Sequence, residues 1–457
     1  MTEPDGLAAL TACPRCDKAP LTTSADGYRC AACNVDFPVI GGIPWLFAEP
    51  DASIGEWRNR LHFALQQLAT ESQQIRAALD EHNEGNLTHR RLAAQAVAKD
   101  EHRQQLRELL APLDIQSSTA NVESYLALRT RLPTDQGIAT YYSNIHRDWA
   151  WGNEENEASL AVIDSVCNGA TLGDTLILGA GAGRLAYDIH RQLDTGMTVA
   201  MDFNPLLLLV AAKVAAGEDL ELYEFPLAPK TMDDIAVKRA LKAPEPAGDD
   251  FRLVLADALR PPFARHSFDT VVTPWLIDVI DEDLPVLATR INNLLKKGGR
   301  WINFGSLAFD HRDAARCYSL EEVLAVVETS GFDDAESTEE TIPYMCSPAS
   351  RHGRRETVFA FSAVKQEDAA PAPRHKALPD WIVTGKEPVP ALPAFRSQAM
   401  STQIYAFVMS MIDGKRTIHD MAALMEKQQL MTKEEAIPAI RNFLTRMHDD
   451  AQRKAGF

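Results

Sequence analysis

Three glycines and an aspartate mark the segment of this sequence whose residue types could bind a small ligand. Gly179, Gly181 and Gly183 follow the apolar run TLIL, and Asp202 ends a second apolar run 23 residues after Gly179. Glycines lack the Cβ atoms that would hold a ligand away from the backbone, and the helix expected after them directs its positive end to the same place. Asp202 stands where a doubly wound sheet places a ribose-binding carboxylate. We therefore expect a nucleotide-like cofactor here.

Four cysteines near the start have the spacing of a metal site. Cys13 and Cys16 form one CxxC pair, Cys30 and Cys33 form a second, and thirteen residues separate the pairs. Each pair fits a tight turn that aims two thiolates at one ion, so two turns complete a tetrahedral zinc shell. Because all four positions are then taken, we predict a structural zinc that supplies folding energy to residues 1–50.

The residues around these cysteines carry a resemblance. Residues 10–48 contain CPRC, CAAC, the pair Phe37-Pro38 and the run Gly42-Ile43-Pro44. In these features the segment resembles the small zinc-ribbon proteins that partner and stabilise tRNA and protein methyltransferases. The resemblance implies that this ribbon is a scaffold.

Composition narrows the class of protein. The 457 residues suffice for two to four domains, and the net charge of −18 makes duplex nucleic acid an unlikely partner. A local basic patch of Arg351, Arg354 and Arg355 is interpreted as a solvated loop. The sequence has neither a long apolar run nor a secretory signal at its start, which predicts a soluble, cytoplasmic protein without a membrane partner.

Alternating strand and helix patterns surround the glycine segment. From residue 136 to 366 they predict an α/β domain, with a doubly wound, mostly parallel sheet and helices on both faces. Residues 333–342 and 355–364 are expected to form a closing hairpin. The long polar insertion 218–251 is expected at the surface or over a site.

Helical patterns flank this domain. Residues 51–135 predict two or three helices, on which His82, His89 and His102 are interpreted as solvated surface side chains. Six prolines within residues 366–394 predict a semi-extended linker, assigned to 367–394.

Residues 395–457 predict a small helical module, with Thr417 to Asp420 and Thr432 to Glu435 as capping boxes. Its run MIDGKRTIHDMAALM resembles the helical part of the peptide chaperone of pyrroloquinoline quinone biosynthesis. The resemblance implies a peptide or protein partner, although no convincing strand precedes the helices.

The aromatic segment 137–156 allows two interpretations. Tyr141, Ile145 and Trp149 recur at the spacing of one helix face, which indicates core packing. The same segment could instead be a lid over the ligand, and the sequence favours neither interpretation.

The type of cofactor follows from several features together. A Walker-type loop is excluded because no Lys-Ser or Lys-Thr follows the glycines, whereas a nicotinamide cofactor stays compatible with GxGxxA. Three features favour S-adenosylmethionine. The glycines run GxGxG, Asp257 closes the next strand where it can bind the adenine amino group, and the strand at Asp269 precedes a turn at Gly298-Gly299.

Five blocks between residues 137 and 365 give a closer match. They are HRDW (146–149), LILGAGAGRLAYDI (176–189), TPWLIDVID (273–281), LLKKGGRWINFGSLAFDH (294–311) and YSLEEVLAVVETSGF (318–332). These blocks resemble carnosine N-methyltransferase and its relatives. The resemblance implies a Rossmann-like methyltransferase that transfers a methyl group from S-adenosylmethionine to an imidazole nitrogen of a histidine-containing dipeptide.

The resemblance also assigns residues. It implies that Asp278 binds the imidazole of the acceptor, that Arg184 binds the cofactor carboxylate, and that Trp149 belongs to the cofactor site. A neutral imidazole nitrogen needs no strong base, so the tasks left are alignment and the holding of the other ring N–H. A carboxylate selects the tautomer and stabilises the imidazolium that forms.

This chain departs from the family on the acceptor side. The family has a histidine where this chain has Asp310, with His311 next to it, and Tyr344 is the one counterpart of the family's tyrosines. Residues 351–355 replace an aromatic-rich stretch. We expect Asp310, His311 and Tyr344 near the acceptor, and a histidine within a longer peptide stays open as substrate.

Two other functions stay open. One is a non-catalytic scaffold or assembly partner with a methyltransferase-like fold. The other is methylation of a different small molecule, a protein or tRNA, although TPWL lacks the Asn and the aromatic residue that methylation of a base amino group uses.

Overall fold

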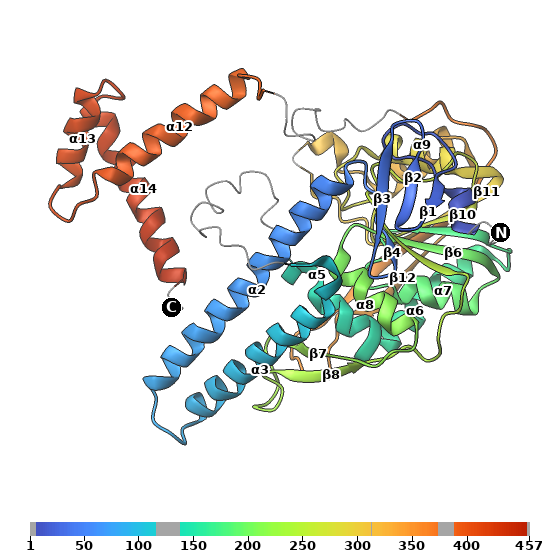
Figure 1. The fold of residues 1–457 in the computed structure, drawn as a ribbon, viewed down its shortest axis with the longest axis horizontal. Coiled ribbons are helices and arrows are strands. Elements are labelled where there is room, and N and C mark those ends of the chain that lie inside the picture. The colour runs from blue at the N-terminus through green and yellow to red at the C-terminus, as the bar shows by residue number, and fades with distance from the viewer. Residues whose placement is uncertain (1–5, 116–137, 312, 373–387, 455–457) are drawn as a thin grey trace. The chain divides into compact units, whose positions relative to one another are not determined.

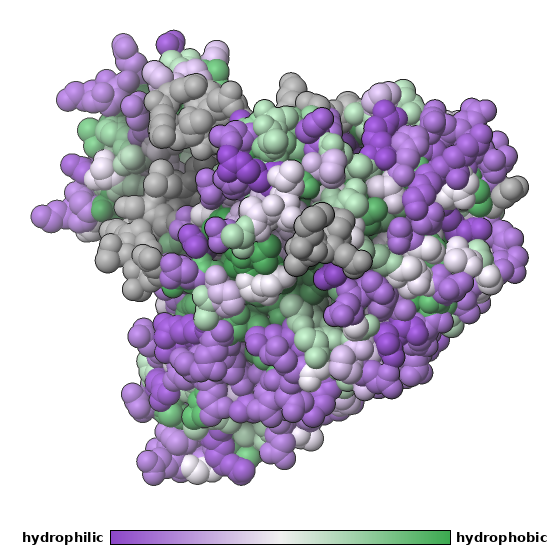
Figure 2. All heavy atoms as spheres, turned by 45° about the vertical axis from the view of Figure 1, so that its right-hand side comes forward, coloured by the Kyte–Doolittle hydropathy of each residue, from purple (hydrophilic) through white to green (hydrophobic). Residues whose placement is uncertain are grey.

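The computed structural model divides into two compact units, Met1–Ala377 and Leu378–Phe457. It describes residues 6–115, 138–311, 313–372 and 388–454. Within these ranges, each helix is too short or too polar to cross a membrane. The face in Figure 2 is largely hydrophilic, with hydrophobic side chains gathered around a hollow near its middle.

A seven-stranded sheet forms the centre of the first unit (Figure 1). Its order is β12-β13-β11-β10-β5-β6-β9. The strands are β5 (Gly173–Leu178), β6 (Thr195–Asp202), β9 (Phe251–Leu255), β10 (Phe268–Pro274), β11 (Leu295–Gly305), β12 (Phe332–Tyr344) and β13 (Arg354–Lys365). All pairings from β11 to β9 are parallel, and β13 runs antiparallel to both β11 and β12. The predicted doubly wound α/β fold is confirmed, including its closing hairpin.

Helices cover both faces of this sheet because its strands are apolar on both sides. The helices are α6 (Asn153–Cys167), α7 (Arg184–Gln192), α8 (Pro205–Ala215), α9 (Leu284–Leu294) and α10 (Leu320–Thr329). Along β5, Leu176 and Leu178 join the core of α9 and α10, whereas Ile177 joins that of α6 and α7. The order of strands reverses between β5 and β10, which is where such sheets bind ligands.

Two long helices, α2 (Pro50–Asp80) and α3 (Leu87–Leu109), lie side by side as a helical hairpin (Figure 1). His102 of α3 was expected on the solvated surface, and that expectation is wrong. The ring is 4% exposed and lies between Tyr142 and Phe225, with centroids 5.0 and 5.4 Å away. Tertiary contacts from α5 (Ile138–His146) thus override its surface-like pattern. A short 3-10 helix, η1 (Ala111–Leu113), follows α3, and residues 116–135 of this region lie outside the described residues.

The polar insertion forms a two-stranded antiparallel sheet of β7 (Leu220–Glu224) and β8 (Val237–Leu241). The loop between these strands is tied to the segment that joins β12 to β13. Lys230 N donates to Ala349 O at 3.0 Å, and Arg351 N donates to Ala228 O at 2.9 Å. The guanidinium of Arg351 also donates to the carbonyls of Pro229 and Lys230. Arg351 is therefore a clamp between two loops, although it stays exposed.

The cysteine-bearing segment forms its own sheet, β1-β2-β3-β4. The elements are α1 (Gly6–Leu10), β1 (Thr22–Ser24), β2 (Gly27–Cys30), β3 (Val35–Ile40) and β4 (Ile43–Pro44). Residues 256–267, all described, form no helix between β9 and β10, so one sheet face needs another cover. Phe37 and Leu46 of the ribbon pack with Val254 there. Trp45 bridges to Leu255 of edge strand β9 and extends the main sheet.

The second unit contains three helices in its described residues, 388–454. They are α12 (Pro393–Ser410), α13 (Ile418–Lys427) and α14 (Lys433–Lys454). The predicted box from Thr417 to Asp420 is present at the start of α13. Met421, Met425 and Ile440 form the core with their neighbours. The described part of this unit holds no strand, and residues 373–387 of the predicted linker lie outside it.

Candidate active site

A cavity of about 340 Å³ lies at the carboxyl ends of β5, β6 and β10, where the strand order reverses. We call its two parts the glycine-turn end and the Asp278 end. The glycine-turn end is lined by Tyr141, Asn144, Arg147, Asp148, Gly179, Gly181, Asp202, Phe203 and Asn204. The Asp278 end is lined by Trp275, Asp278, Ser306, Ala308, Tyr344 and Arg354.

The three glycines of the turn adopt left-handed backbone conformations. Gly179, Gly181 and Gly183 have φ of 78°, 58° and 92°. A Cβ at Gly183 would lie 2.9 Å from the Cβ of Ala211, so this glycine permits close packing of α8 below the turn. Around Gly181 the space within 4 Å of an added Cβ is open, and this residue lines the cavity. The turn therefore presents bare backbone to a ligand.

Asp202 ends β6 beside this turn. Its two carboxylate oxygens accept hydrogen bonds from Gly181 N and Asn204 N, both at 2.8 Å. Burial raises the pKa of Asp202 to about 6, against the opposing effect of these amides. Each oxygen keeps further lone pairs, so the carboxylate can still accept from a hydroxyl in the cavity.

Three residues expected at the cofactor, Trp149, Asp257 and Gly183, do not line the cavity. Trp149 Nε1 donates to Ala182 O at 2.7 Å, so the indole supports the turn from beneath. Asp257 accepts from Leu259 N at 2.9 Å, and the residues on either side of Asp257 line the cavity in its place. Gly183 likewise does not line the cavity. Their roles at a cofactor stay predictions.

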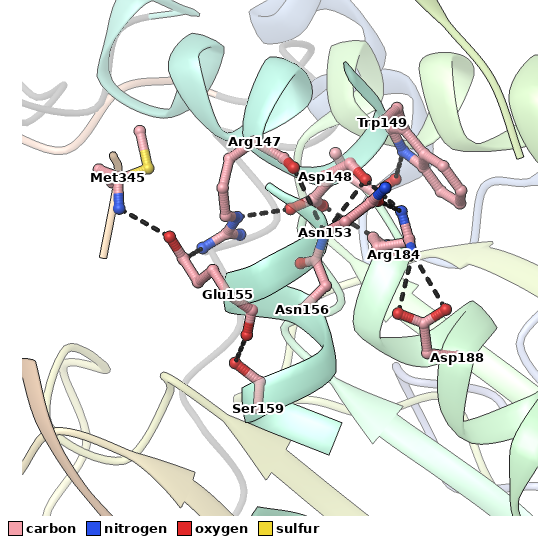
Figure 3. Close-up of polar contacts among 11 residues, drawn as sticks. Arg147, Asp148, Trp149, Asn153, Glu155, Asn156, Ser159, Arg184, Asp188 and Met345 are labelled. Carbon is pink, nitrogen blue, oxygen red and sulfur yellow. Dashed lines mark hydrogen bonds and ion pairs between the residues drawn. The ribbon is translucent and has the colours of Figure 1, made fainter. Parts of the chain in front are cut away.

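Arg184 does not line the cavity either, and its guanidinium contacts Asp188 and Asp148 (Figure 3). Its Nε lies 2.8 and 3.0 Å from the carboxylate oxygens of Asp188, and its Nη1 donates to Asp148 O at 2.9 Å. The side chain is 8% exposed. The guanidinium therefore joins α7 to the segment before α6. Binding of a cofactor carboxylate by Arg184 remains a prediction, and this geometry does not favour it.

Arg147, which our sequence reasoning did not assign to the site, does line the cavity (Figure 3). It begins a π-helical turn, Arg147–Trp151, that ends where Gly152 N donates to Arg147 O at 2.9 Å. A Cβ on Gly152 would lie 2.2 Å from this oxygen, so the turn requires glycine. Such turns often occur at functional sites because they redirect neighbouring side chains.

Two buried carboxylates hold the Arg147 guanidinium. Its Nε donates to Asp148 Oδ1 at 2.7 Å and its Nη1 to Glu155 Oε1 at 2.9 Å. Within the described ranges, no hydrogen bond engages Nη2, which leaves one donor for a ligand. The core-packing interpretation of the aromatic segment is confirmed for Ile145 and Trp149, which are buried. Tyr141 lines the cavity, and a lid formed by this segment stays a prediction. The signal that sequence reasoning missed was the charged pair Arg147-Asp148, which interrupts an apolar helix pattern shortly before Gly152.

At the other end, Asp278 faces the cavity as predicted. Its Oδ2 accepts from Ala308 N at 3.0 Å and from Ser306 Oγ at 3.3 Å. Burial raises the pKa of Asp278, and the Ala308 amide acts against that rise. The neighbouring Trp275 has φ of 49°, and a Cβ on Gly305 would lie 3.1 Å from its backbone nitrogen.

Aromatic and cationic side chains complete this end. Tyr344, at the end of β12, lies with its ring centroid 5.0 Å from that of Trp275. The guanidinium carbon of Arg354 lies 4.5 Å from the Tyr344 centroid. Tyr344 therefore lies in the cavity where its sequence position suggested, beside an arginine that was interpreted as a solvated loop residue.

Asp310 and His311 are not brought to this cavity. Asp310 is exposed on the loop after β11. His311 Nδ1 accepts from Asp313 N at 3.0 Å, and its Nε2 lies 2.7 Å from Arg316 Nη1. These partners hold the imidazole within its own loop. A catalytic role for either residue stays a prediction.

The four cysteine sulfurs form a separate cluster in the ribbon. All four lie within 4.8 Å of one another, and the pairs Cys13–Cys33 and Cys16–Cys30 are each 3.5 Å apart. A tetrahedron with metal–sulfur bonds of about 2.3 Å has edges of about 3.8 Å, so the spacing fits one ion. The residue after each CxxC pair is left-handed, Asp17 at 59° and Asn34 at 56°.

Comparison with solved structures gives methyltransferases at low similarity. Two structures of phosphoethanolamine N-methyltransferase 2 from Haemonchus contortus are 16% identical, with TM-scores of 0.33 and 0.34. They match 51% and 55% of this chain, which spans 58% and 61% of theirs. An S-adenosylmethionine-dependent methyltransferase from Thermotoga maritima is 15% identical over 50% of this chain and 96% of its own, with a TM-score of 0.31. The curated protein sequences contain no significant match.

The family comparison covers the domain that holds the cavity. The family described as carnosine N-methyltransferase matches residues 136–367, which is 232 of the 457 residues and thus more than half of the chain. The match includes both ends of the cavity, from Tyr141 to Arg354. The chain therefore belongs to the carnosine N-methyltransferase family and is an S-adenosylmethionine-dependent methyltransferase.

Proposed function

We propose that this enzyme methylates an imidazole nitrogen of a histidine-containing dipeptide or peptide. The observation that carries the proposal is Asp278, a half-buried carboxylate that lines the same cavity as the glycine turn. A carboxylate in this position can accept the N–H of an imidazole and fix its tautomer. The opposite ring nitrogen then keeps its lone pair for attack.

The chain's own residues account for binding and charge. The cofactor supplies a methyl group already activated on a sulfonium sulfur. Asp278 stabilises the imidazolium that forms as the new carbon–nitrogen bond replaces the carbon–sulfur bond, and the ring proton is later lost to solvent. Trp275 and Tyr344 offer aromatic faces to that cation. No strong base is needed in this scheme.

We assign the cofactor to the glycine-turn end. The backbone at Gly181 admits the amino-acid tail, and Asp202 accepts from the ribose hydroxyls. Arg147 is our candidate for the cofactor carboxylate in place of Arg184, because Arg147 lines the cavity and keeps one unengaged nitrogen. Asp148 and Glu155 hold that guanidinium in a single orientation.

The ribbon is proposed to bind structural zinc through Cys13, Cys16, Cys30 and Cys33. Four thiolates fill a tetrahedral shell, so the ion would take no part in methyl transfer. Its effect would reach the enzyme through the ribbon's contact with β9. Metal analysis of the purified protein should give one zinc per chain, lost in Cys13→Ser together with thermal stability. Retention of stoichiometric zinc in that variant would contradict the assignment.

The second unit is proposed to recruit a peptide or protein. Its described residues form three helices, of which α13 and α14 begin at the capping boxes of Thr417 and Thr432, and the sequence of this stretch resembles the helical part of a peptide chaperone. The described residues of this unit offer no strand edge, so helix faces would have to bind the partner. Deletion of residues 388–457 should leave methylation of a dipeptide intact and weaken methylation of a longer peptide substrate.

Mass spectrometry of methyl transfer tests the main proposal. The full-length protein is incubated with S-adenosylmethionine and, in separate reactions, carnosine, histidine and histidine-containing peptides. A gain of one methyl group on the imidazole of at least one acceptor is expected, and Asp278→Ala should abolish it. Turnover on a non-imidazole acceptor alone would contradict the imidazole assignment while leaving the methyltransferase assignment intact.

A further inference from the structure

Arg354 lines the acceptor side of the cavity and carries a positive charge there. The sequence had been interpreted as placing this residue in a solvated loop. Arg354 begins β13 and lines the Asp278 end together with Tyr344. Its guanidinium carbon lies 4.5 Å from the Tyr344 ring centroid, and its Nε donates to Glu356 Oε2 at 2.6 Å. Ring and carboxylate together fix the plane of the guanidinium.

The outer edge of this guanidinium is left for a ligand. Among the described residues, no acceptor is bonded to the two terminal nitrogens of Arg354, and the side chain is 59% exposed. Two parallel N–H groups on one planar edge match the two oxygens of a carboxylate. The next residue, Arg355, provides a contrast, because it lies outside the cavity lining and donates to Thr341 O at 2.9 Å.

The Asp278 end of the cavity contains charged groups of both signs. Asp278 carries the negative charge proposed to face the imidazole, and Arg354 lies in the same cavity with a positive charge. Glu356 interacts with both groups. Its carboxylate pairs with Arg354, and its charge adds to the effect of burial in raising the pKa of Asp278. A ligand with a cation-forming ring and a separate anion complements this pattern.

We propose that Arg354 binds a free carboxylate of the methyl acceptor and thereby selects acceptors that combine an imidazole with a carboxylate. The inference rests on the proposed imidazole substrate and adds a second point of recognition to it. An acceptor without that carboxylate would lose the contact with the outer edge of the guanidinium.

Binding of two matched ligands tests this inference. Titration calorimetry on the full chain saturated with S-adenosylhomocysteine compares carnosine with carnosine amide, which differ at the carboxylate. We expect the wild-type protein to bind carnosine about tenfold more tightly, the size of one charge-assisted contact. Arg354→Gln should remove that preference by weakening carnosine alone. Arg355→Gln changes a neighbouring charge outside the cavity and should retain it.

The outcomes separate the two proposals. Equal affinity of the wild-type protein for the two ligands overturns the role of Arg354, as does an Arg354→Gln variant that weakens both ligands equally. Methyl transfer is measured on the same samples. If carnosine binds more tightly than its amide but is not methylated, the role of Arg354 is supported and the imidazole substrate is overturned. If carnosine is methylated but binds no more tightly than its amide, the imidazole substrate is supported and the role of Arg354 is overturned. If neither ligand binds or is methylated, both proposals fail.

Discussion

The two ends of the cavity are built in different ways. The glycine-turn end uses backbone amides and buried groups, and its main residues lie between Tyr141 and Asn204. The Asp278 end uses side chains from four separate segments, around Asp278, Ala308, Tyr344 and Arg354. One end is therefore built on the backbone after β5 and β6 and on buried ion pairs, which we expect to be rigid, and the other is assembled from side chains on separate loops.

This difference matches the two ligands that we propose. A cofactor shared by many enzymes can be bound by backbone geometry and by a few buried charges, which tolerate little change. An acceptor is recognised by side chains on loops, which can be replaced without disturbing the sheet. The departure at residues 351–355, which the family resemblance implies, would be a change of the second kind.

The largest effect on cofactor binding is expected from substitution of Arg147, and Arg184 provides the comparison. Arg147→Gln should weaken binding of S-adenosylhomocysteine about 300-fold, because a buried charge contact to the ligand is lost. Arg184→Gln should change the affinity by less than about threefold, since its guanidinium is engaged by Asp188. Both variants should lower the melting temperature, because each leaves a buried carboxylate unpaired. Calorimetry on the folded variants provides the measurement.

The reverse result would restore the sequence expectation. If Arg184→Gln loses cofactor binding and Arg147→Gln keeps it, the carboxylate contact belongs to Arg184, and the ion pair with Asp188 must open on binding. The glycine-turn end would then be mobile rather than rigid, and the comparison of the two ends would fail.

A smaller effect is expected at the other end. Asp278→Asn should lower kcat for methyl transfer about 100-fold, because an amide cannot stabilise the imidazolium. Affinity for S-adenosylhomocysteine should stay within about twofold, since Asp278 lies outside the glycine-turn end. Ser306→Ala, which removes the 3.3 Å hydrogen bond to Asp278, is a mild control with a severalfold decrease. Loss of cofactor affinity in Asp278→Asn would show that the two ends are not separable.

The dependence of binding on pH tests Asp202. Its pKa is raised to about 6 by burial, so the carboxyl takes up a proton as pH falls through that value. A protonated carboxyl accepts poorly from ribose hydroxyls, and affinity for S-adenosylhomocysteine should decrease about tenfold from pH 7 to pH 5. Asp202→Asn should bind weakly with little dependence on pH in this range. A flat profile in the wild-type protein would argue against Asp202 as the ribose contact.

The same shift has the opposite sign for stability. The folded carboxyl of Asp202 holds its proton more tightly than the unfolded chain does, whose pKa is near 3.8. The contribution of this group to the free energy of unfolding therefore rises as pH falls from about 6 towards 3.8. Acidification would thus weaken cofactor binding without destabilising the fold through this residue.

At the glycine-turn end, the sequence indicated Gly179, Gly181 and Asp202 correctly as neighbours, whereas Gly183, Arg184, Asp257 and Trp149 do not line the cavity. The glycines, Asp202 and the strands around them follow from short-range patterns, and the structure places them together. Arg147 was missed because its position depends on a π turn, which shifts the side chain out of the register that a helical pattern implies. Arg184 was assigned to the cofactor because the sequence analysis overlooked its ion pair with Asp188, which lies one turn along the same helix.

The Asp278 end was predicted only in part because its side chains come from loops whose positions no local pattern specifies. Asp278 follows a strand at the ligand edge of the sheet, so topology alone indicates it. Tyr344 and Arg354 are brought in by the hairpin of β12 and β13, whose register no local pattern specifies. His311 shows the opposite error, because bonds within its own loop keep it from the cavity.

The smallest expected effect concerns Glu155, which connects the two ends. Its Oε1 accepts from Arg147 Nη1, and its Oε2 accepts from Met345 N at 2.7 Å, directly after Tyr344 (Figure 3). Glu155→Gln keeps an oxygen for one of these donors and turns an amide N–H₂ towards the other. We expect about fivefold weaker binding of S-adenosylhomocysteine and about a fivefold higher KM for the acceptor.

The exposed neighbour Glu154 offers a matched control, and Glu154→Gln should leave both quantities unchanged. If Glu155→Gln alters the cofactor end alone, the two ends are independent, and the acceptor loops can vary without effect on cofactor binding. If both quantities change together, cofactor binding helps to order the loop that carries Tyr344. The rigid end would then position part of the variable one, because a single buried carboxylate joins a residue of the π turn to the segment that begins at Met345.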